Sequence, residues 1–271
     1  MKAIIKRNIT WYGWRPDLPD YRDLAFKAQA KTLLKLPKLI DLRGDCPPVY
    51  DQGQLGSCTA NAIGGAIEFG LRKQGIQFDF MPSRLFIYYN ERAIEGTVNI
   101  DNGAEIRNGI KTVNKQGVCS EKMWKYSDGK VQFKKKPLPK CYKEGLNHQV
   151  LTYQRVDRDL NQMKGCLVEG FPFVLGFTVY DGFESSIMSK TGILNMPGAG
   201  EKVLGGHAVL CVGYDDSTNR FIVRNSWNTD WGQNGYFTMP YEYLLHPNLS
   251  DDFWTVRLVE ENPVKNKVSK K

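Results

Sequence analysis

One stretch, residues 50–71, constrains the fold more than any other part of this 271-residue chain. Its first half contains Gly53 and Gly56, which indicate a tight loop. Its second half places small and apolar residues on one helical face, namely Ile63, Ala66, Ile67, Gly70 and Leu71. Ser57 can cap the start of this helix, and Gly75 can end it. The sequence therefore predicts a glycine loop that leads into a helix with a buried face of small side chains.

Cys58 stands in the first turn of the predicted helix. The unpaired N–H groups and the dipole of a helix N-terminus stabilise an anion, so they favour a lowered thiol pKa there. Because the thiolate is the nucleophilic form of cysteine, Cys58 is a candidate catalytic residue. A small buried cysteine that only packs at a helix start explains this residue alone equally well.

Composition bounds the class of protein. A hydrophobic content of 41% in 271 residues suffices for one large domain or a two-lobed one. The formal net charge is +8, and four of the lysines lie in 261–271, which we expect to be a basic, disordered tail. No nucleic-acid-binding module accompanies this charge, so no specific nucleic-acid partner is expected.

The chain shows no export or membrane signal. Residues 1–8 lack the apolar core of a signal peptide, and the apolar run 171–177 has only the length of a core strand. None of the six cysteines is in Cys-x-x-Cys spacing, so neither a metal site nor thioredoxin chemistry is indicated. We expect mostly reduced thiols and no cofactor.

The patterns along the chain predict a helical half followed by a β half. Helical patterns occupy 22–35, 82–90 and 104–115, and the basic, proline-containing segment 126–140 is expected to be a solvated connector. One further helix is predicted at 161–169. The predicted strands are 39–43, 149–156, 172–180, 192–195, 207–214, 220–225, 235–239 and 253–259. This α+β order suits two lobes with a cleft between them.

Three further residues can complete a site with Cys58. His207 starts a predicted strand and Asn225 ends the next one, so an antiparallel pairing would bring them within hydrogen-bond reach. Gln52 precedes Cys58 in the same loop, and its amide could bind an oxyanion beside the Cys58 N–H. A cysteine nucleophile needs a base, and the base needs an orienting partner. Each residue alone has an ordinary structural explanation, but their joint occurrence favours a nucleophilic site.

These motifs resemble those of the papain/cathepsin family of cysteine peptidases. The matching segments are Gln52, Gly56-Ser57-Cys58, Gly206-His207-Ala208, Asn225-Ser226-Trp227, Trp231-Gly232 and Gly235-Tyr236-Phe237. The resemblance runs from about residue 36 to residue 259. It implies an α+β, two-lobed papain-like fold with a helical left lobe, a β-barrel-like right lobe and an active-site cleft between them.

The resemblance also implies a division of the chain. The peptidase domain would span 37–260, with a left lobe mainly at 58–147 and a right lobe mainly at 148–260 plus 37–57. Residues 1–36 would be an N-terminal extension that could serve as a short pro-segment.

The site residues take their roles from the same resemblance. Cys58 would attack a peptide carbonyl to form an acyl-enzyme, His207 would act as acid and base, and Asn225 would orient His207. The Cys58 N–H and Gln52 would bind the oxyanion, and Trp227 would shield the His207–Asn225 bond from water. The residues implied to bind polypeptide substrate in an extended conformation are Gly103, Ala104, Gly206 and Trp227.

Three departures from the family pattern stand near the motifs. Leu55 replaces the usual disulfide cysteine, Thr59-Ala60-Asn61 replaces Trp-Ala-Phe, and Asn228 replaces a glycine. These changes argue against the usual disulfide pattern but not against the chemistry. With about 36 residues before the matching region, we expect no long prodomain of the kind that secreted members have, and the pattern is similar to compact bacterial or giant-virus members. We therefore expect an intracellular or virion-associated monomer without membrane contact.

Residues 1–36 are predicted to restrain the activity by lying against the cleft as an intramolecular inhibitor. The segment 11–21 is aromatic and interrupted by prolines, hence extended, which suits a groove that binds extended peptides. The alternative is a structural brace that packs elsewhere on the molecule.

Other classes of function stay open at this point. A transglutaminase-like acyl transferase would use Asp215 or Asp216 as the third residue of its site, although Gln52 argues against it. A catalytically silent papain-fold binding module would be expected to lack one of the four site residues, and none is missing. A nucleic-acid-associated protein would show salt-dependent binding.

Overall fold

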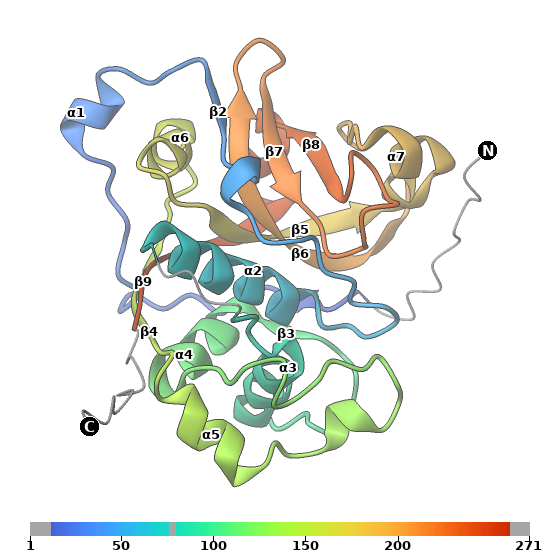
Figure 1. Cartoon of the computed structure of the whole chain (residues 1–271). Coiled ribbons are helices and arrows are strands. Elements are labelled where there is room, and N and C mark those ends of the chain that lie inside the picture. The colour runs from blue at the N-terminus through green and yellow to red at the C-terminus, as the bar shows by residue number, and fades with distance from the viewer. Residues whose placement is uncertain (1–11, 76–79, 261–271) are drawn as a thin grey trace.

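The computed structural model describes residues 12–75 and 80–260, and its elements form two groups (Figure 1). The upper group is a seven-stranded sheet with the path β4, β9, β5, β6, β7, β8, and with β2 paired to β6. All of these pairings are antiparallel. The strands are β2 Leu39–Asp41, β4 Val150–Arg155, β5 Phe173–Tyr180, β6 Val203–Asp215, β7 Arg220–Arg224, β8 Tyr236–Pro240 and β9 Ser250–Val259.

The predicted α+β class with two lobes is confirmed, but the β lobe is not a closed barrel. Among the described strands no pairing joins β8 back to β4, so the sheet stays open. Residues 192–195, predicted as a strand, make only one isolated bridge, from Ile193 to Thr238 of β8. Gly192 takes a left-handed backbone with a φ of 61° directly before this bridge, which leaves too short an extended run to continue the sheet.

The lower group is helical, and α2 lies between it and the sheet (Figure 1). Small residues let α2 approach both sides closely: a Cβ on Gly65 would lie 3.5 Å from Leu210 of β6, and a Cβ on Gly109 of α4 would lie 2.4 Å from Ile63. The predicted helix that starts at Cys58 is therefore the partition between the lobes. The helices are α1 Ala30–Leu33, α2 Cys58–Lys73, α3 Arg84–Ile94, α4 Ile106–Gln116, α5 Pro139–Gly145, α6 Leu160–Val168, α7 Ser186–Thr191 and α8 Tyr241–Leu245.

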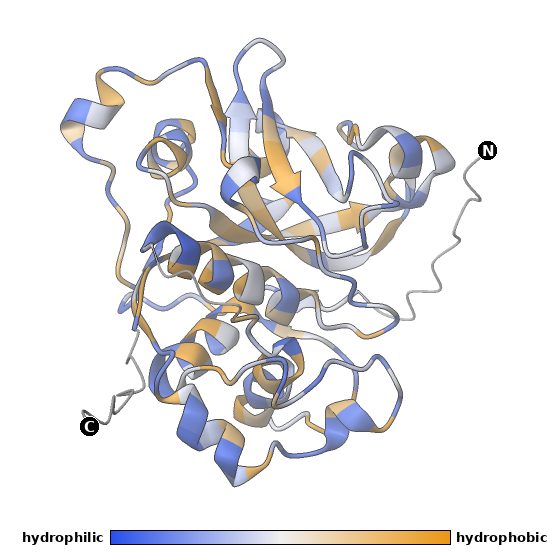
Figure 2. Cartoon of the chain, viewed as in Figure 1, coloured by the Kyte–Doolittle hydropathy of each residue, from blue (hydrophilic) through white to orange (hydrophobic). Residues whose placement is uncertain are grey.

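The sheet is buried on both faces. Along β6, Ala208 and Leu210 pack into the core shared with α2, whereas Val209 and Cys211 pack into a second core on the other face. This alternation follows the two-residue period of a strand. In Figure 2 the apolar residues accordingly gather on the strands and on the inner helices, while α5 at the edge is mostly hydrophilic. Because both faces of the sheet are packed, the positions of the side chains on β6 and β7 are fixed.

Two helical predictions were wrong in part. Ala104 and Glu105 do not start a helix but form β3, Ala104–Glu105, ahead of α4, because the Ala104 N–H donates to the carbonyl of Gly13 at 2.8 Å. Only four residues of the predicted helix 22–35 are helical, and the N–H groups of Phe26, Ala28 and Gln29 instead donate to other elements. The segment 126–140 is not just a connector, since it contains a short 3-10 helix, Gln132–Lys134, and the start of α5.

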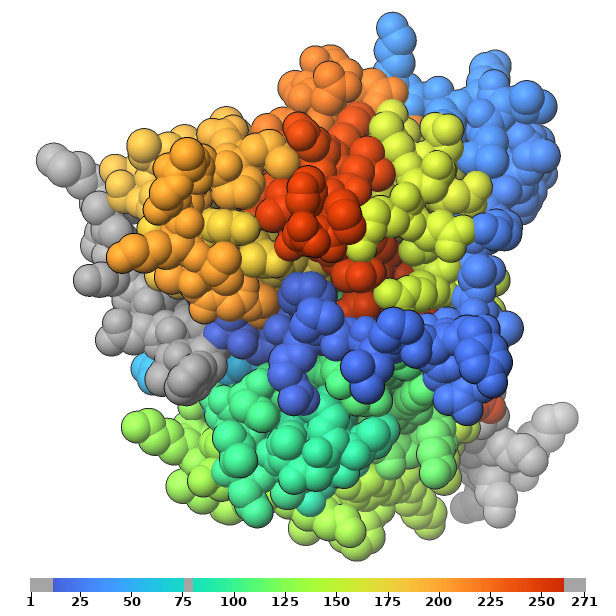
Figure 3. Space-filling view, turned by 180° about the vertical axis from the view of Figure 1, so that it is seen from behind, coloured from blue at the N-terminus to red at the C-terminus, as the bar shows by residue number. Residues whose placement is uncertain are grey.

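An extended N-terminal segment lies between the two groups of elements. We call residues 12–29 the strap, residues 12–15 its gate and residues 17–29 its anchor. Seen from behind, the strap is a blue band between the green helical half and the yellow-to-red sheet half (Figure 3). Within the gate, β1, Trp14–Arg15, pairs in parallel with β3. The strap therefore contacts both halves.

The anchor is fixed by buried charge pairs. The Asp17 carboxylate accepts from the backbone N–H of Arg107 at 3.0 Å and from Trp254 Nε1 at 2.9 Å. Asp23 receives the Arg107 guanidinium at 2.5 Å, with both side chains at most 10% exposed. Because Arg107 belongs to α4 and Trp254 to β9, the anchor ties the helical half to the sheet.

Backbone pairing and an aromatic side chain complete the anchor. The Phe26 N–H donates to the carbonyl of Arg155 at 2.7 Å, and the Arg155 N–H donates to the carbonyl of Leu24 at 2.8 Å. Phe26 is 2% exposed and belongs to the second core. Burial of a phenylalanine side chain stabilises a fold by about 1.5–3 kcal/mol, so the anchor is part of the folded body.

No helix within the described ranges is long and apolar enough to cross a membrane. The predicted basic tail, 261–271, lies outside the described residues, as do residues 1–11 of the N-terminal extension.

Candidate functional site

Cys58 is the first residue of α2 and is fully buried. Ser57 stands at the N-cap position, as predicted, but its side chain does not cap the helix. Its Oγ instead lies 2.5 Å from the Tyr126 hydroxyl, which also donates to the carbonyl of Gln52 at 2.8 Å. The first-turn N–H groups of α2 are therefore left for other partners, as is usual at an uncapped helix start.

The thiol of Cys58 is held neutral in this structure. Burial raises its pKa to about 12, although N–H groups of Ala208, Gly13 and Thr59 directed at the sulfur each lower it. The helix start alone favours the opposite shift. The difference from the lowered pKa expected from the sequence arises because the gate covers the sulfur, and loss of solvation then outweighs the local dipoles.

His207 and Asn225 meet across the β6–β7 hairpin. His207 Nε2 and Asn225 Oδ1 are 2.8 Å apart, and the Ser226 N–H donates to the same oxygen at 2.8 Å. Since that oxygen is fixed as an acceptor, His207 Nε2 carries a hydrogen, so Nδ1 is the basic nitrogen whenever the ring is neutral. The sulfur of Cys58 lies beside the backbone of Ala208, the residue after His207.

Aromatic rings enclose the histidine. Trp227 lies 5.1 Å from His207 between ring centroids, at an interplanar angle of 31°, and Phe177 and Phe183 lie at 5.8 Å and 6.2 Å. His207 and Trp227 are only 1% and 2% exposed. Trp227 therefore lies beside the buried His207 ring, where the resemblance implied that it would lie.

Gln52 is buried beside the start of α2. Its Oε1 accepts from Ser226 Oγ at 2.5 Å, and its Nε2 donates to the carbonyl of Leu55 at 2.9 Å. An amide nitrogen carries two hydrogens, so one N–H remains for a ligand. From the sequence Ser226 is only the middle residue of a motif, and its role as the partner of Gln52 was missed because nothing in the spacing brings residues 52 and 226 together.

The gate covers this site. The Tyr12 ring lies 5.9 Å from the His207 ring and 6.4 Å from the Trp227 ring, and its hydroxyl donates to Glu184. The next residue, Gly13, directs its backbone N–H at the sulfur of Cys58. Two consecutive strap residues thus lie on the base and on the thiol.

The fit of Gly13 leaves no room for a side chain. A Cβ at this position would lie 1.7 Å from the carbonyl oxygen of Gly56, in the loop that leads to Cys58. On the other side, a Cβ on Gly103 would lie 1.9 Å from the Gly13 carbonyl oxygen. Of the implied substrate-binding residues, Ala104 is therefore already paired with the chain's own backbone, and Gly103 is in close contact with it.

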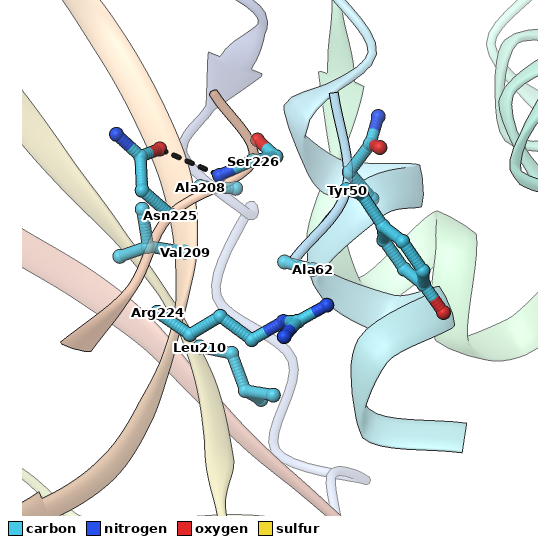
Figure 4. A pocket seen from close by; sticks show the side chains of 9 residues that line it. Tyr50, Ala62, Ala208, Val209, Leu210, Arg224, Asn225 and Ser226 are labelled. Atoms are coloured by element: carbon cyan, nitrogen blue, oxygen red, sulfur yellow. Dashed lines mark hydrogen bonds between the residues drawn. The ribbon is translucent and has the colours of Figure 1, made fainter. Parts of the chain in front are cut away.

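A small cavity adjoins the site. It has a volume of about 10 Å³ and lies between α2 and the β6–β7 hairpin, where the stick view shows Tyr50 and Ala62 facing Ala208 and Arg224 (Figure 4). That volume holds about one water molecule, so it cannot take a peptide. The backbone edge at Ala104 is instead occupied by the gate.

The structure does not place Asp215 or Asp216, the acids of the alternative acyl-transferase site, beside His207. Asp216 accepts from Lys164 at 2.5 Å and from Tyr241 at 2.7 Å, and Asp215 lies at the far end of β6. In the part of the chain that the structure describes, no group of three or more His, Cys, Asp or Glu residues could hold a metal ion. All six cysteines fall in that part, and none forms a disulfide.

Sequence comparison finds similar proteins along most of the chain. The model of the family described as "Papain family cysteine protease" matches residues 36–244. An uncharacterised peptidase C1-like protein of Acanthamoeba polyphaga mimivirus is 43% identical over 288 residues, covering 97% of this chain and 91% of that protein. Cathepsin B-like CP2 of Giardia intestinalis is 29% identical over 218 residues, covering 75% and 69%.

Structure comparison agrees. Xylellain, a cysteine protease from Xylella fastidiosa, superimposes with a TM-score of 0.86 at 44% identity, covering 93% of this chain and 96% of that one. The procathepsin B S9 of Trypanosoma congolense has a TM-score of 0.67 at 19% identity, covering 80% and 76%, and shares the fold. The strap precedes the family match, but the coverage of the mimivirus protein is wide enough to include it.

Proposed function

The chain belongs to the papain family of cysteine proteases and is a cysteine-type peptidase, and we propose that it cleaves peptide bonds through an acyl-enzyme on Cys58 while its gate keeps the full-length chain latent. The observation that carries the chemistry is the His207–Asn225 pair, bonded at 2.8 Å beside the buried sulfur. Nucleophile, base and orienting group are the three parts that such a site needs.

In the proposed reaction the neutral His207 takes the proton of Cys58 at Nδ1, and the sulfur attacks the carbonyl carbon of the scissile bond. His207 then returns the proton to the leaving amine, so that the C–N bond breaks and a thioester remains. In the second half His207 removes a proton from water, and the water oxygen attacks the thioester carbon. The C–S bond then breaks, the acid is released, and His207 returns the proton to the Cys58 sulfur. Asn225 accepts from Nε2 throughout and stabilises the charged imidazolium.

Oxyanion binding is proposed for two donors. Cys58 is the first residue of α2, so its N–H belongs to the turn without intrahelical partners. The second N–H of Gln52 Nε2 is the other donor, and its amide is pre-oriented by Ser226 and Leu55. Donors fixed before the reaction cost no reorganisation when the charge develops.

Substrate would bind where the gate lies. The Gly13 carbonyl already accepts from the Ala104 N–H, which supports Ala104 as a backbone anchor for an extended peptide. Gly103 and Gly206 lack side chains where strap atoms pass within 3 Å of a hypothetical Cβ, so a substrate backbone can approach equally closely.

The same contacts support latency. The gate covers the sulfur, contacts the His207 ring edge-on through Tyr12 and occupies the backbone edge at Ala104, so substrate and gate exclude each other. The anchor supports the brace interpretation as well, because Phe26 and Asp17 are built into the folded body. We therefore propose that the gate inhibits and that the anchor braces. A truncated chain that starts at Pro37 would lack both parts at once.

The acyl-enzyme is tested by trapping. The full-length Gly13→Ala chain, whose gate cannot seat, is mixed with a p-nitrophenyl ester and quenched in acid. We expect a mass gain of one acyl group on the proteolytic fragment that contains Cys58, with loss of that mass on standing in water. Acylation of another residue, or peptide hydrolysis that persists after Cys58 is alkylated, would contradict the mechanism.

Gln52→Ala in the same Gly13→Ala background should lower kcat for peptide hydrolysis by about 10²-fold, the scale for losing one oxyanion donor. KM should change little, because the donor acts on the charge that develops in the reaction. Gln54→Ala is the matched control, since Gln54 is an exposed residue of the same loop. Equal rates for the two variants would remove Gln52 from the oxyanion site.

A further inference from the structure

Glu91 carries a buried carboxyl group that the proposed reaction does not use. It lies on α3 with no exposed surface, and its Oε1 accepts from the Thr59 hydroxyl of α2 at 2.6 Å. On the other side, a Cβ on Gly109 of α4 would lie 2.7 Å from Glu91 Oε2. Three helices therefore enclose the carboxyl group, and Oε2 has no hydrogen-bond partner among the residues that the structure describes.

The carboxyl group of Glu91 is held neutral. Burial raises its pKa well above the usual value. The charged groups around it are Arg92 and Glu95 on the same helix and Arg15 of the gate. The Arg92 guanidinium donates to backbone carbonyls and Arg15 pairs with Glu95, so both cations are engaged elsewhere. A neutral group suits this position, because a negative charge on Glu91 would disfavour the Cys58 thiolate.

Thr59 connects Glu91 to the nucleophile. It follows Cys58 in the first turn of α2 and directs its backbone N–H at the Cys58 sulfur. The Ser57 side chain does not cap this helix, so the turn lacks the hydrogen bond that an N-cap usually supplies. Thr59 is also one of the positions at which the chain departs from the family pattern, where tryptophan is usual. The bond to Glu91 therefore gives the turn a fixed point on α3.

We propose that Glu91 is a positioning residue for the nucleophile: its hydrogen bond to Thr59 holds the first turn of α2 so that the Thr59 N–H stays directed at the Cys58 sulfur. The inference rests on the proposed peptidase function and adds a residue that touches no reacting atom. An N–H group stabilises a thiolate only while it points at the sulfur. Loss of the bond lets the turn relax, so the thiolate becomes less stable and the chemical step slower.

The test uses the full-length Gly13→Ala chain, in which the gate does not cover the sulfur. Thr59→Val keeps the shape of the side chain and removes the donor, whereas Glu91→Leu removes the acceptor. Each should lower kcat for peptide hydrolysis by about 10-fold with little change in KM, the scale of one buried hydrogen bond. Labelling of Cys58 with iodoacetamide, followed against pH, should need a higher pH in both variants, because less thiolate forms.

Three further variants separate positioning from stability. Glu91→Gln keeps an acceptor oxygen for Thr59 and should restore both kcat and the labelling profile. Thr59→Val combined with Glu91→Leu replaces both partners by apolar groups, which is nearly neutral for stability, so the unfolding midpoint should change little while kcat stays low. Thr255→Val is the matched control, because Thr255 is equally buried and donates to the carbonyl of Pro172 at 3.0 Å, in the sheet. Its kcat should be unchanged.

Several results would overturn the positioning role. One is an unchanged kcat and labelling profile in the double variant. Another is an equal loss of kcat in Thr255→Val and Thr59→Val, which would show a general effect of removing a buried hydroxyl. A third is a loss in Glu91→Gln as large as that in Glu91→Leu. If the Gly13→Ala chain hydrolysed no peptide but its labelling profile shifted as expected, the positioning role would be supported and the peptidase mechanism refuted.

Discussion

The Gly13→Ala substitution is expected to make the full-length chain hydrolyse an unstructured peptide about 10²-fold faster than the unsubstituted chain, since over-packing costs about 1–3 kcal/mol and each 1.4 kcal/mol is tenfold in population. The new Cβ would lie 1.7 Å from the Gly56 carbonyl oxygen. That oxygen belongs to the loop before Cys58, which cannot yield without moving the nucleophile, so the gate moves instead. Residues 17–29 stay bound, and the fold keeps its brace.

The measurements for this variant are peptide hydrolysis and labelling with iodoacetamide at one pH. In the unsubstituted chain, burial raises the pKa of the Cys58 thiol to about 12, so little thiolate exists near neutral pH and labelling should be slow. Opening the gate restores solvation, lowers the pKa and should speed both reactions together. Gly44→Ala is the control, because a Cβ on Gly44 meets no atom within 4 Å. An unchanged rate in the folded Gly13→Ala variant would show that the gate does not restrain the enzyme.

Cys58→Ala in the Gly13→Ala background should lower peptide hydrolysis by about 10⁶-fold, the scale for removing the nucleophile of a comparable triad. Without the Cys58 sulfur no thioester can form in the site, and His207 can then only transfer protons. The substitution removes one buried sulfur at a helix start, so the thermal unfolding midpoint should shift by only a few degrees.

Cys166→Ala provides the matched control for that experiment. Cys166 is equally buried, lies on α6, and donates to the carbonyl of Phe171 at 3.4 Å, away from the gate. Its replacement should leave kcat unchanged. If Cys166→Ala abolished hydrolysis and Cys58→Ala did not, the assignment of the nucleophile would be wrong.

Much of the fold follows from local patterns in the sequence. The predicted helix at 161–169 corresponds to α6 within one residue, and the predicted strand 172–180 corresponds to β5 within one residue. Both have strong periodicity and clear ends, which are local properties. The geometry that joins His207 to Asn225 was also predictable, because sequence-adjacent strands with a short turn usually pair.

The secondary-structure predictions that were wrong concern segments whose conformation depends on contacts with distant parts of the chain. Ala104 forms a strand only because Gly13, far away in sequence, supplies the carbonyl that pairs with it. Residues 24–29 stay out of a helix because several of their N–H groups find partners on other elements, such as Gln162 Oε1 for Ala28 at 2.8 Å and Glu169 Oε1 for Gln29 at 2.9 Å. Local propensity favours a helix in both places, and tertiary hydrogen bonds override it.

The prediction for the pKa of Cys58 failed for the same reason. A helix start predicts a lowered value, and the structure has a raised one because the strap buries the sulfur. The sequence suggested that the aromatic N-terminal segment would fill a groove, but nothing in its spacing indicates that Gly13 would be the residue on the thiol.

The anchor makes the gate a tethered competitor of substrate. Only Pro16 separates the gate from Asp17, whose carboxylate is bonded to α4 and β9. A binding group held by a short tether acts at an effective concentration on the order of millimolar, whatever the concentration of the protein. Dilution of the protein therefore cannot activate this enzyme. A substrate peptide must compete with the gate at an effective concentration that does not fall on dilution. Cleavage of the chain between the gate and the anchor would remove this effective concentration, because the released N-terminal fragment would diffuse into bulk solution.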